Sequence, residues 1–146
     1  MAAIEANSGN SSSRQQYGNI NVASILIAED DQAVRDFVSR ALTYYGHQVT
    51  VVPDGGAALA ALSERRFDLM LTDIVMPGID GIALALKATK ADPQMSVLMM
   101  TGFANEGQRA HNLEALIDQV IAKPFSLKDI CAAVNQALSS RKARAH

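Results

Sequence analysis

Five short apolar segments recur along the chain, and each is followed by a polar turn and then by a longer stretch whose apolar residues have helical spacing. These segments read SILIAE, QVTVV, DLMLT, SVLMMT and QVIA, and they are apolar on both faces. A strand with two apolar faces must be covered on both sides, as parallel strands are when helices connect them. The alternation therefore predicts an α/β fold with a doubly wound parallel sheet of five strands and five helices.

The turn residues set the expected boundaries and arrangement of these elements. Right-handed crossovers leave few topologies, and the flavodoxin-like strand order 2-1-3-4-5 fits five strand–helix units best. Asp31 is placed to cap the first helix and Gly46 to end it, while Ser126 and Asp129 resemble a capping box at the start of the last helix. The expected strands are residues 24–29, 48–52, 68–72, 96–101 and 119–122, and the expected helices end near Tyr45, Arg66, Ala91, Leu116 and Arg141.

The chain is expected to form one domain with a short extension at each end. Residues 1–23 are rich in Ser, Asn, Gln and Gly and nearly lack large apolar residues, which predicts a disordered N-terminal extension. Residues 24–140 hold every expected element, and residues 141–146 form a short basic tail. This leaves no room for a winged-helix or helix-turn-helix module after the domain, which argues against a DNA-binding transcription regulator.

The composition excludes several classes of partner and location. The formal net charge is −2, so no general affinity for nucleic acid or for acidic membranes is expected. Cys131 is the only cysteine, which excludes disulfide frameworks and multi-cysteine metal sites. The apolar runs are too short to span a bilayer, and no secretory signal begins the chain. The expected location is the cytoplasm.

Chemically active residues follow four of the expected strands. Glu29 and Asp30 end the first strand, Asp73 follows the third, Thr101 ends the fourth and Lys123 follows the fifth. The carboxyl ends of parallel strands meet at one edge of a sheet, where ligands bind. Converging carboxylates need a cation, and oxygen ligands without His or Cys favour Mg²⁺, which prefers one or two carboxylates together with phosphate oxygens. The set therefore predicts a Mg²⁺-dependent phosphoryl site.

Each of these residues also has an ordinary structural interpretation. Asp31 is expected to be a helix cap and Asp80 a turn residue, and Lys123 or Thr101 alone would be an unremarked surface or strand-end residue. The coincidence of an acid pair, a further acid, a hydroxyl and a lysine at four strand ends favours the functional interpretation. The first strand ends in acids where a phosphate cradle would need glycines, which argues against a flavodoxin-like nucleotide binder.

The motifs ILIAEDD, LTDIVMPGIDG, MMTGFA and IAKPF resemble those of the receiver domain of response regulators in two-component signalling, which has a CheY-like fold. The resemblance covers about residues 24–139. It implies that Asp73 is the phospho-acceptor and that Glu29, Asp30, Asp73 and the main-chain carbonyl of Val75 hold Mg²⁺. It also implies that Thr101 and Lys123 contact the phosphoryl group.

The same resemblance implies a cis peptide bond at Pro124 and carries one departure. Most receivers have Tyr or Phe three residues before the lysine as a rotating switch, and this chain has Val120 there. Among receivers, these motif sequences are most similar to those of CpdR-like stand-alone regulators, which act as phosphorylation-controlled adaptors for the ClpXP protease. The receiver segments of hybrid histidine kinases share much of the same motif sequence.

The expected function is a switch and not an enzyme. A histidine kinase or a histidine phosphotransfer protein would donate a phosphoryl group to Asp73, and an output partner would meet the face made by the helix up to residue 116, strand 119–122 and the last helix. The alternatives are a phosphorelay intermediate, a phosphate sink, or an aspartyl-phosphate phosphatase. The last resembles Asp-x-Asp at the nucleophile, and here the second position is Val75, which supplies no general acid or base.

Overall fold

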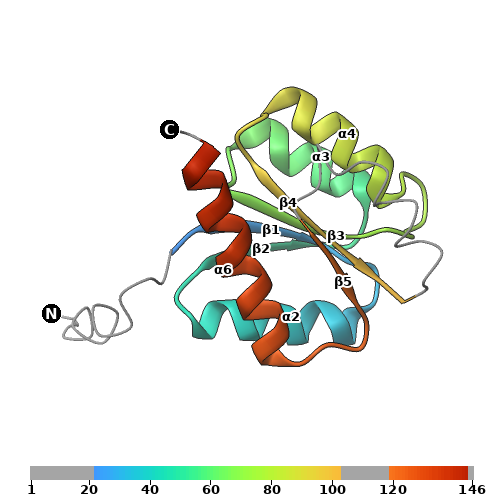
Figure 1. The fold of residues 1–146 in the computed structure, drawn as a ribbon. Helices are drawn as coiled ribbons and strands as arrows, with labels where there is room; N and C mark the ends of the chain where they lie inside the picture. Colours follow the sequence, from blue (N-terminus) through green and yellow to red (C-terminus); the bar gives the residue numbers. More distant parts are fainter. Residues whose placement is uncertain (1–21, 103–118, 145–146) are drawn as a thin grey trace, which may run out of the picture.

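The computed structural model describes residues 22–102 and 119–144 as alternating strands and helices (Figure 1). The strands are β1 (Ser24–Ala28), β2 (Gln48–Val52), β3 (Leu69–Asp73), β4 (Ser96–Thr101) and β5 (Gln119–Ala122). The helices are α2 (Gln32–Tyr44), α3 (Gly55–Glu64), α4 (Gly81–Ala91) and α6 (Leu127–Arg144). The helix expected to end near residue 116 lies outside the described residues.

The strands form one parallel sheet in the order β2-β1-β3-β4-β5, which confirms the predicted topology. Figure 1 shows α2 and α6 covering one face of this sheet and α3 and α4 covering the other. The order of strands reverses between β1 and β3, so the carboxyl ends of these two central strands lie side by side at one edge.

The core is divided by the sheet into two layers because successive strand residues point to opposite faces. On β1, Ile25 and Ile27 pack in the layer with α2 and α6, while Leu26 packs in the layer with α3 and α4. β3 repeats the alternation, with Leu71 in the first layer and Met70 in the second. All five side chains are fully buried, which explains why the sequence of each strand is apolar on both faces.

The helix caps form as the sequence predicts. The Asp31 carboxylate accepts hydrogen bonds from the N–H groups of Ala33 and Val34 at the start of α2. Gly46, with a φ of 93°, follows the last turn of that helix in a conformation that disfavours other residues. At the start of α6, Ser126 Oγ accepts from the Asp129 N–H at 3.0 Å and Asp129 Oδ2 accepts from the Ser126 N–H at 3.0 Å.

Two strands differ from the prediction by one residue. β1 ends at Ala28 and not at Glu29, although the Glu29 N–H still donates to the Val52 carbonyl at 3.1 Å. β3 runs one residue later than expected. Asp68 precedes it, and its carboxylate accepts a hydrogen bond from the Ser24 N–H at 2.8 Å. Asp73 is therefore the last residue of β3 and pairs with Met100 in the ladder to β4.

α3 ends at Glu64, two residues before the expected end at Arg66. Its C-cap, Arg65, is extended, and the guanidinium lies over the Phe67 ring at 4.7 Å and donates to Thr50 Oγ1 at 3.1 Å. These contacts hold the Arg65 side chain against the Phe67 ring and β2.

The regular part of the chain extends slightly beyond both ends of the expected domain. Ala23, which the sequence analysis places in the extension, is buried, and its N–H donates to His47 Nδ1 at 3.0 Å. Its carbonyl accepts from the Gln48 N–H at 2.9 Å. At the other end, α6 continues to Arg144, into the expected basic tail. Within the described ranges, the helices are too short or too polar to cross a lipid bilayer.

Candidate functional site

Three carboxylates meet where β1 and β3 end. Glu29, Asp30 and Asp73 each offer an oxygen within 4.8 Å of the others. Glu29 and Asp73 are buried, whereas Asp30 is exposed. The convergence follows from the topology, because β1 and β3 are neighbours and parallel, with Ala28 opposite Thr72 in the register. The predicted clustering of these acids is therefore present in the structure.

Lys123 joins two of these acids from the end of β5. Its Nζ lies 2.7 Å from Asp73 Oδ1 and 2.8 Å from Glu29 Oε1. The backbone of Lys123 is fixed to β4, since its main-chain N–H donates to the Thr101 carbonyl at 2.7 Å. The peptide bond between Lys123 and Pro124 is cis, as the resemblance implies. The basic partner that Asp73 lacks nearby in the sequence is thus supplied by a distant strand end.

Glu29 is fixed by contacts that the sequence analysis did not identify. Its second oxygen, Oε2, accepts from the Asp31 N–H at 2.9 Å. Arg35, one turn into α2, donates from Nη1 to the Glu29 carbonyl at 2.8 Å. No spacing rule signals this contact, because an arginine on a helix surface is most often solvated. Arg35 holds the backbone that carries the acid pair.

The charges in this cluster shift one another's protonation. Burial, together with the adjacent Glu29 carboxylate, raises the pKa of Asp73 to about 7 against the pull of Lys123. Burial also acts to raise the pKa of Glu29, but contacts with Asp73, Lys123 and the Asp31 N–H outweigh it and lower that pKa. Burial acts to lower the pKa of Lys123, and its two acidic partners raise it. One lysine therefore does not fully neutralise two buried carboxylates, and the site favours additional positive charge.

The donor set fits a hard divalent cation. All three candidate ligand groups are carboxylates, and Mg²⁺ prefers oxygen ligands. Burial raises the pKa of Asp73 most, and the adjacent Glu29 carboxylate raises it further, so a cation between the two would favour the ionised form of Asp73. Such an acidic triad is typical of the Mg²⁺ site of receiver domains.

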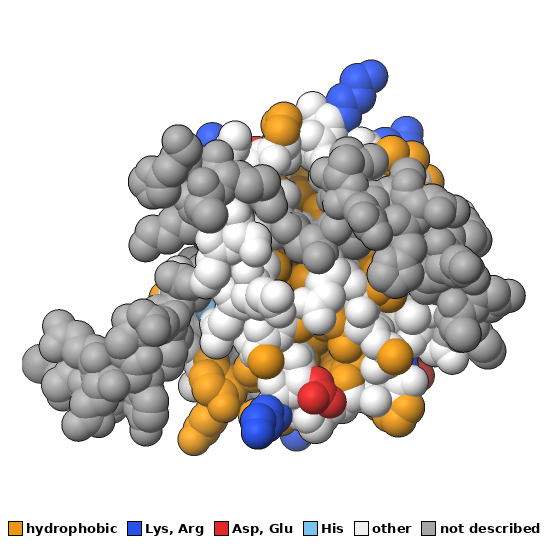
Figure 2. All heavy atoms as spheres, viewed as in Figure 1, with side chains coloured by type: hydrophobic (Ala, Val, Ile, Leu, Met, Phe, Trp, Pro, Cys, Tyr) orange, Lys and Arg blue, Asp and Glu red, His pale blue; other side chains and the backbone are white. Residues whose placement is uncertain are grey.

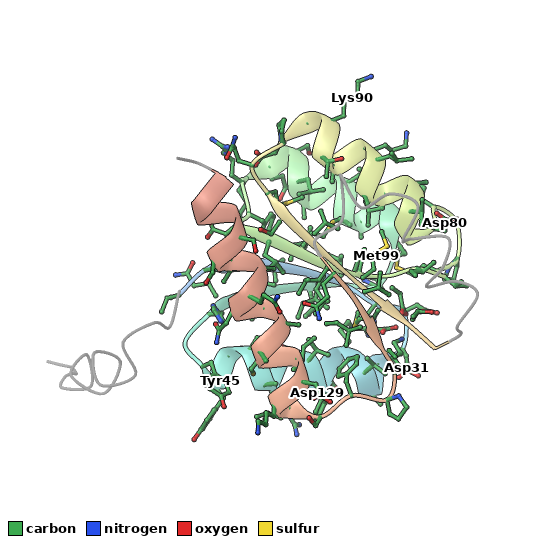
Figure 3. The ribbon with its side chains drawn as sticks, in the orientation of Figure 1. Asp31, Tyr45, Asp80, Lys90, Met99 and Asp129 are labelled. Atoms are coloured by element: carbon green, nitrogen blue, oxygen red, sulfur yellow. The ribbon has the colours of Figure 1, made fainter. Side chains whose placement is uncertain are left out.

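The other predicted residues lie around this cluster without all joining it. Thr101 is buried at the end of β4, beside the strand position that pairs with Asp73. Val75 is about half exposed beyond β3, at 53 %. Val120 is half-buried and packs in the core layer of α3 and α4. Asp80 caps α4 by accepting from the Ala83 N–H at 2.9 Å, and Figure 3 places it on the same side of the molecule as Asp31.

An apolar groove adjoins the cluster on the α2 side. It has a volume of about 460 Å³, and Phe37 and Phe125 in its lining have ring centroids 6.3 Å apart. Lys123 belongs both to this groove and to the acidic cluster. The full lining is Ala33, Val34, Phe37, Lys123, Pro124 and Phe125. A protein seated on the groove would lie next to Asp73.

A second groove lies between β5 and α6, with a volume of about 390 Å³. Val120, Phe125 and Ala133 contribute to its lining. Figure 2 shows exposed hydrophobic side chains on the viewed face of the molecule, beside the atoms that are not described. Phe125 lines both this groove and the groove on the α2 side, so the two lie next to each other.

Comparison with known proteins agrees with this arrangement. The family model described as "Response regulator receiver domain" matches residues 25–135. The response regulator receiver protein CpdR of Brucella abortus is 40% identical over 114 residues, covering 78% of this chain and 95% of that protein. The response regulator MprA of Mycobacterium avium is 30% identical over 118 residues. The match covers 81% of this chain and 52% of MprA, so this chain spans about half the length of that relative.

Solved structures show the same fold. A CheY-like response regulator receiver domain protein from Methanospirillum hungatei superposes with a TM-score of 0.78 at 31% identity, covering 85% of this chain and 99% of that one. NtrX from Brucella abortus gives a TM-score of 0.79 at 29% identity, covering 85% of this chain and 29% of NtrX. The matched family model covers the five strands except Ser24, together with the acidic cluster and its lysine. The chain therefore belongs to the response regulator receiver domain family.

Proposed function

We propose that the chain is a response regulator receiver that accepts a phosphoryl group on Asp73 from a phosphohistidine donor in a Mg²⁺-dependent reaction. The observation that carries the proposal is the contact of Lys123 Nζ with both Asp73 and Glu29, within an acidic cluster open at Asp30. A carboxylate fixed at a strand end, next to a cation and a metal-type donor set, is suited to phosphoryl chemistry.

In the proposed transfer an oxygen of Asp73 forms a bond to phosphorus while the bond between phosphorus and the donor imidazole nitrogen breaks. The imidazole leaves with the bonding electron pair, so no oxidant or reductant is needed. Lys123 and the Thr101 hydroxyl would contact the phosphoryl oxygens, and Glu29, Asp30, Asp73 and the Val75 carbonyl would hold the ion. When bound, Mg²⁺ supplies positive charge that neutralises the carboxylates and the incoming phosphoryl oxygens.

The donor is a histidine kinase or a histidine phosphotransfer protein, a class that follows from membership of the receiver family. Its approach over the groove of Phe37 and Phe125 is supported by Lys123, which lines that groove and bonds Asp73. Signalling of this kind operates in the cytoplasm, the location that the sequence analysis predicts.

A chemical donor tests the proposal directly. The full chain is incubated with Mg²⁺ and acetyl phosphate or phosphoramidate, and the intact mass is measured. We expect a gain of one phosphoryl group in the wild type and none in Asp73→Asn or in excess chelator. An equal gain in Asp73→Asn, or no gain in the wild type, contradicts the proposal. Steady turnover of phosphate monoesters would favour the phosphatase instead, against which the half-exposed apolar Val75 argues.

The output is proposed to be a change in protein–protein contacts, as in a CpdR-like protease adaptor. The support is the 40% identity to CpdR over 95% of that protein, and the groove between β5 and α6 offers a surface for the partner. A pull-down with Asp73→Ala and with phosphorylated wild type separates the candidates. Capture of protease components in one state supports the adaptor, whereas capture of only kinases or phosphotransfer proteins favours a phosphorelay intermediate or phosphate sink.

A further inference from the structure

The first residue of α4, Gly81, packs directly on the backbone of the proposed acceptor. A Cβ atom at Gly81 would overlap the carbonyl oxygen of Asp73 and would lie 2.8 Å from its carbonyl carbon and 3.0 Å from Ile74 Cα. All three are backbone atoms, so no side-chain rotation could relieve the overlap. Any residue larger than glycine would have to move either the start of α4 or the end of β3.

The backbone that Gly81 touches is held on its other sides as well. The Gly81 N–H donates to the Ile74 carbonyl at 2.7 Å, which closes the loop of residues 74–80. The Ile74 N–H donates to the Met100 carbonyl at 3.0 Å, and Thr72 Oγ1 donates to the Asp73 carbonyl at 3.0 Å. The carbonyl group of Asp73 is thus fixed by a hydroxyl and by a helix that contacts it without an intervening side chain.

We propose that Gly81 is a positioning residue for phosphoryl acceptance: its missing side chain lets α4 seat on the Asp73 carbonyl group, and this contact sets the position of the Asp73 carboxylate relative to Lys123 and Glu29. The inference rests on the proposed function and goes beyond it by assigning a residue with no reactive group. The ion pairs of Lys123, at 2.7 and 2.8 Å, leave little tolerance for displacement of the strand end.

Two other glycines near this edge of the sheet provide matched controls. A Cβ atom at Gly55, at the start of α3, would lie 2.8 Å from the Ile79 carbonyl oxygen and 3.0 Å from Ile79 Cβ. Gly55→Ala therefore strains the far end of the same loop and leaves the backbone of Asp73 uncontacted. A Cβ atom at Gly102, next to Thr101, would meet nothing within 4 Å. Gly102→Ala adds the same methyl group without a steric conflict.

The experiment measures phosphoryl uptake from acetyl phosphate by the full chain and its alanine variants, per folded molecule, with donor and Mg²⁺ varied separately. Displacement of a reacting group by about 1 Å can cost on the order of 100-fold in rate. We expect Gly81→Ala to lower the maximal rate at saturating Mg²⁺ and donor at least about tenfold. Gly102→Ala should stay within about twofold and Gly55→Ala within about threefold, even where its stability falls as far as that of Gly81→Ala.

A maximal rate of Gly81→Ala equal to that of Gly55→Ala at matched stability overturns the inference, because general strain in the loop would then suffice. If Gly81→Ala does not fold, even with a stabilising osmolyte, Thr72→Val replaces it. That variant frees the same carbonyl from its hydroxyl donor at nearly constant volume. An unchanged maximal rate in Thr72→Val then overturns the inference. A wild type that takes up no phosphoryl group overturns the proposed function itself, which is a different outcome.

Discussion

Replacement of Asp73 by Asn should stabilise the metal-free protein at neutral pH, with a gain that depends on pH. Asp73 is buried next to Glu29, and burial with this adjacent carboxylate raises the pKa of Asp73 from 3.8 to about 7. Asn has nearly the same shape and carries no charge. The variant therefore removes the repulsion between the two carboxylates while the packing at the end of β3 is kept.

The sign follows from proton binding in the two states. In the unfolded chain Asp73 releases its proton near pH 4, whereas in the metal-free native state it keeps the proton until about pH 7. Between these values the native state binds more protons, so the free energy of unfolding of the wild type falls as pH rises. The variant lacks this loss. The difference between the two should be small near pH 4, grow through the interval and level off above pH 7.

The pKa shift sets the size of the effect. A change from 3.8 to about 7 corresponds to a ceiling of about 4 kcal/mol, at about 1.4 kcal/mol per unit. The amide also loses the charged contact with Lys123 Nζ at 2.7 Å, which offsets part of the gain. We therefore expect a net stabilisation of about 2 kcal/mol at pH 8.

Urea unfolding in the presence of a chelator, from pH 4 to pH 8, measures this difference. Asp36→Asn on the exposed surface of α2 is the control, since it removes the same charge away from the cluster. Saturating Mg²⁺ should then stabilise the wild type by about 2.7 kcal/mol at a hundredfold excess over its dissociation constant, and the variant by less. Parallel curves for wild type and Asp73→Asn across the whole pH range would refute the reasoning.

Three further predictions concern other contacts. Lys123→Met should lower the free energy of unfolding by about 1–3 kcal/mol in urea titrations, because Asp73 and Glu29 lose their shared cation, and the cost should shrink in combination with Asp73→Asn. Burial lowers the pKa of His47, so wild-type stability should fall as pH drops below about 6.5, and His47→Gln should flatten that slope between pH 7 and pH 5. Ser126→Ala should cost about 1 kcal/mol by loss of the α6 cap and leave phosphoryl uptake unchanged.

The sequence predicts the architecture well because hydrophobic period and strand–helix alternation are sufficient for it. Five strands, their order and the caps of α2 and α6 are all present in the structure. The one-residue shift of β3 shows the limit of the pattern. Asp68 and Asp73 flank an apolar run. The sequence does not show that Asp68 lies just before the strand, with its carboxylate on the Ser24 N–H, while Asp73 belongs to the strand and pairs with Met100.

Which residues gather at the candidate site is also predictable, because topology alone brings the carboxyl ends of β1, β3, β4 and β5 to one edge of the sheet. The contacts that support these residues are not predictable from the sequence. Arg35 acts through a backbone carbonyl, and Gly81 acts by having no side chain, so neither residue type signals its role. Contacts of this kind depend on distances between backbone atoms, which residue spacing does not encode.

The packing of Val120 limits how a change at the proposed acceptor, Asp73, could reach the groove beside β5. Its half-buried side chain packs beside Met99 in the layer of α3 and α4, so this position holds a small aliphatic group that cannot rotate as a ring would. The backbone link from the Lys123 N–H to the Thr101 carbonyl joins the ends of β5 and β4 directly. A shift of Lys123 toward a phosphoryl group would act on both strand ends through this hydrogen bond. Among the described residues, this backbone hydrogen bond links the strand end that carries Lys123 to the end of β4, and Val120 supplies no aromatic ring at its position.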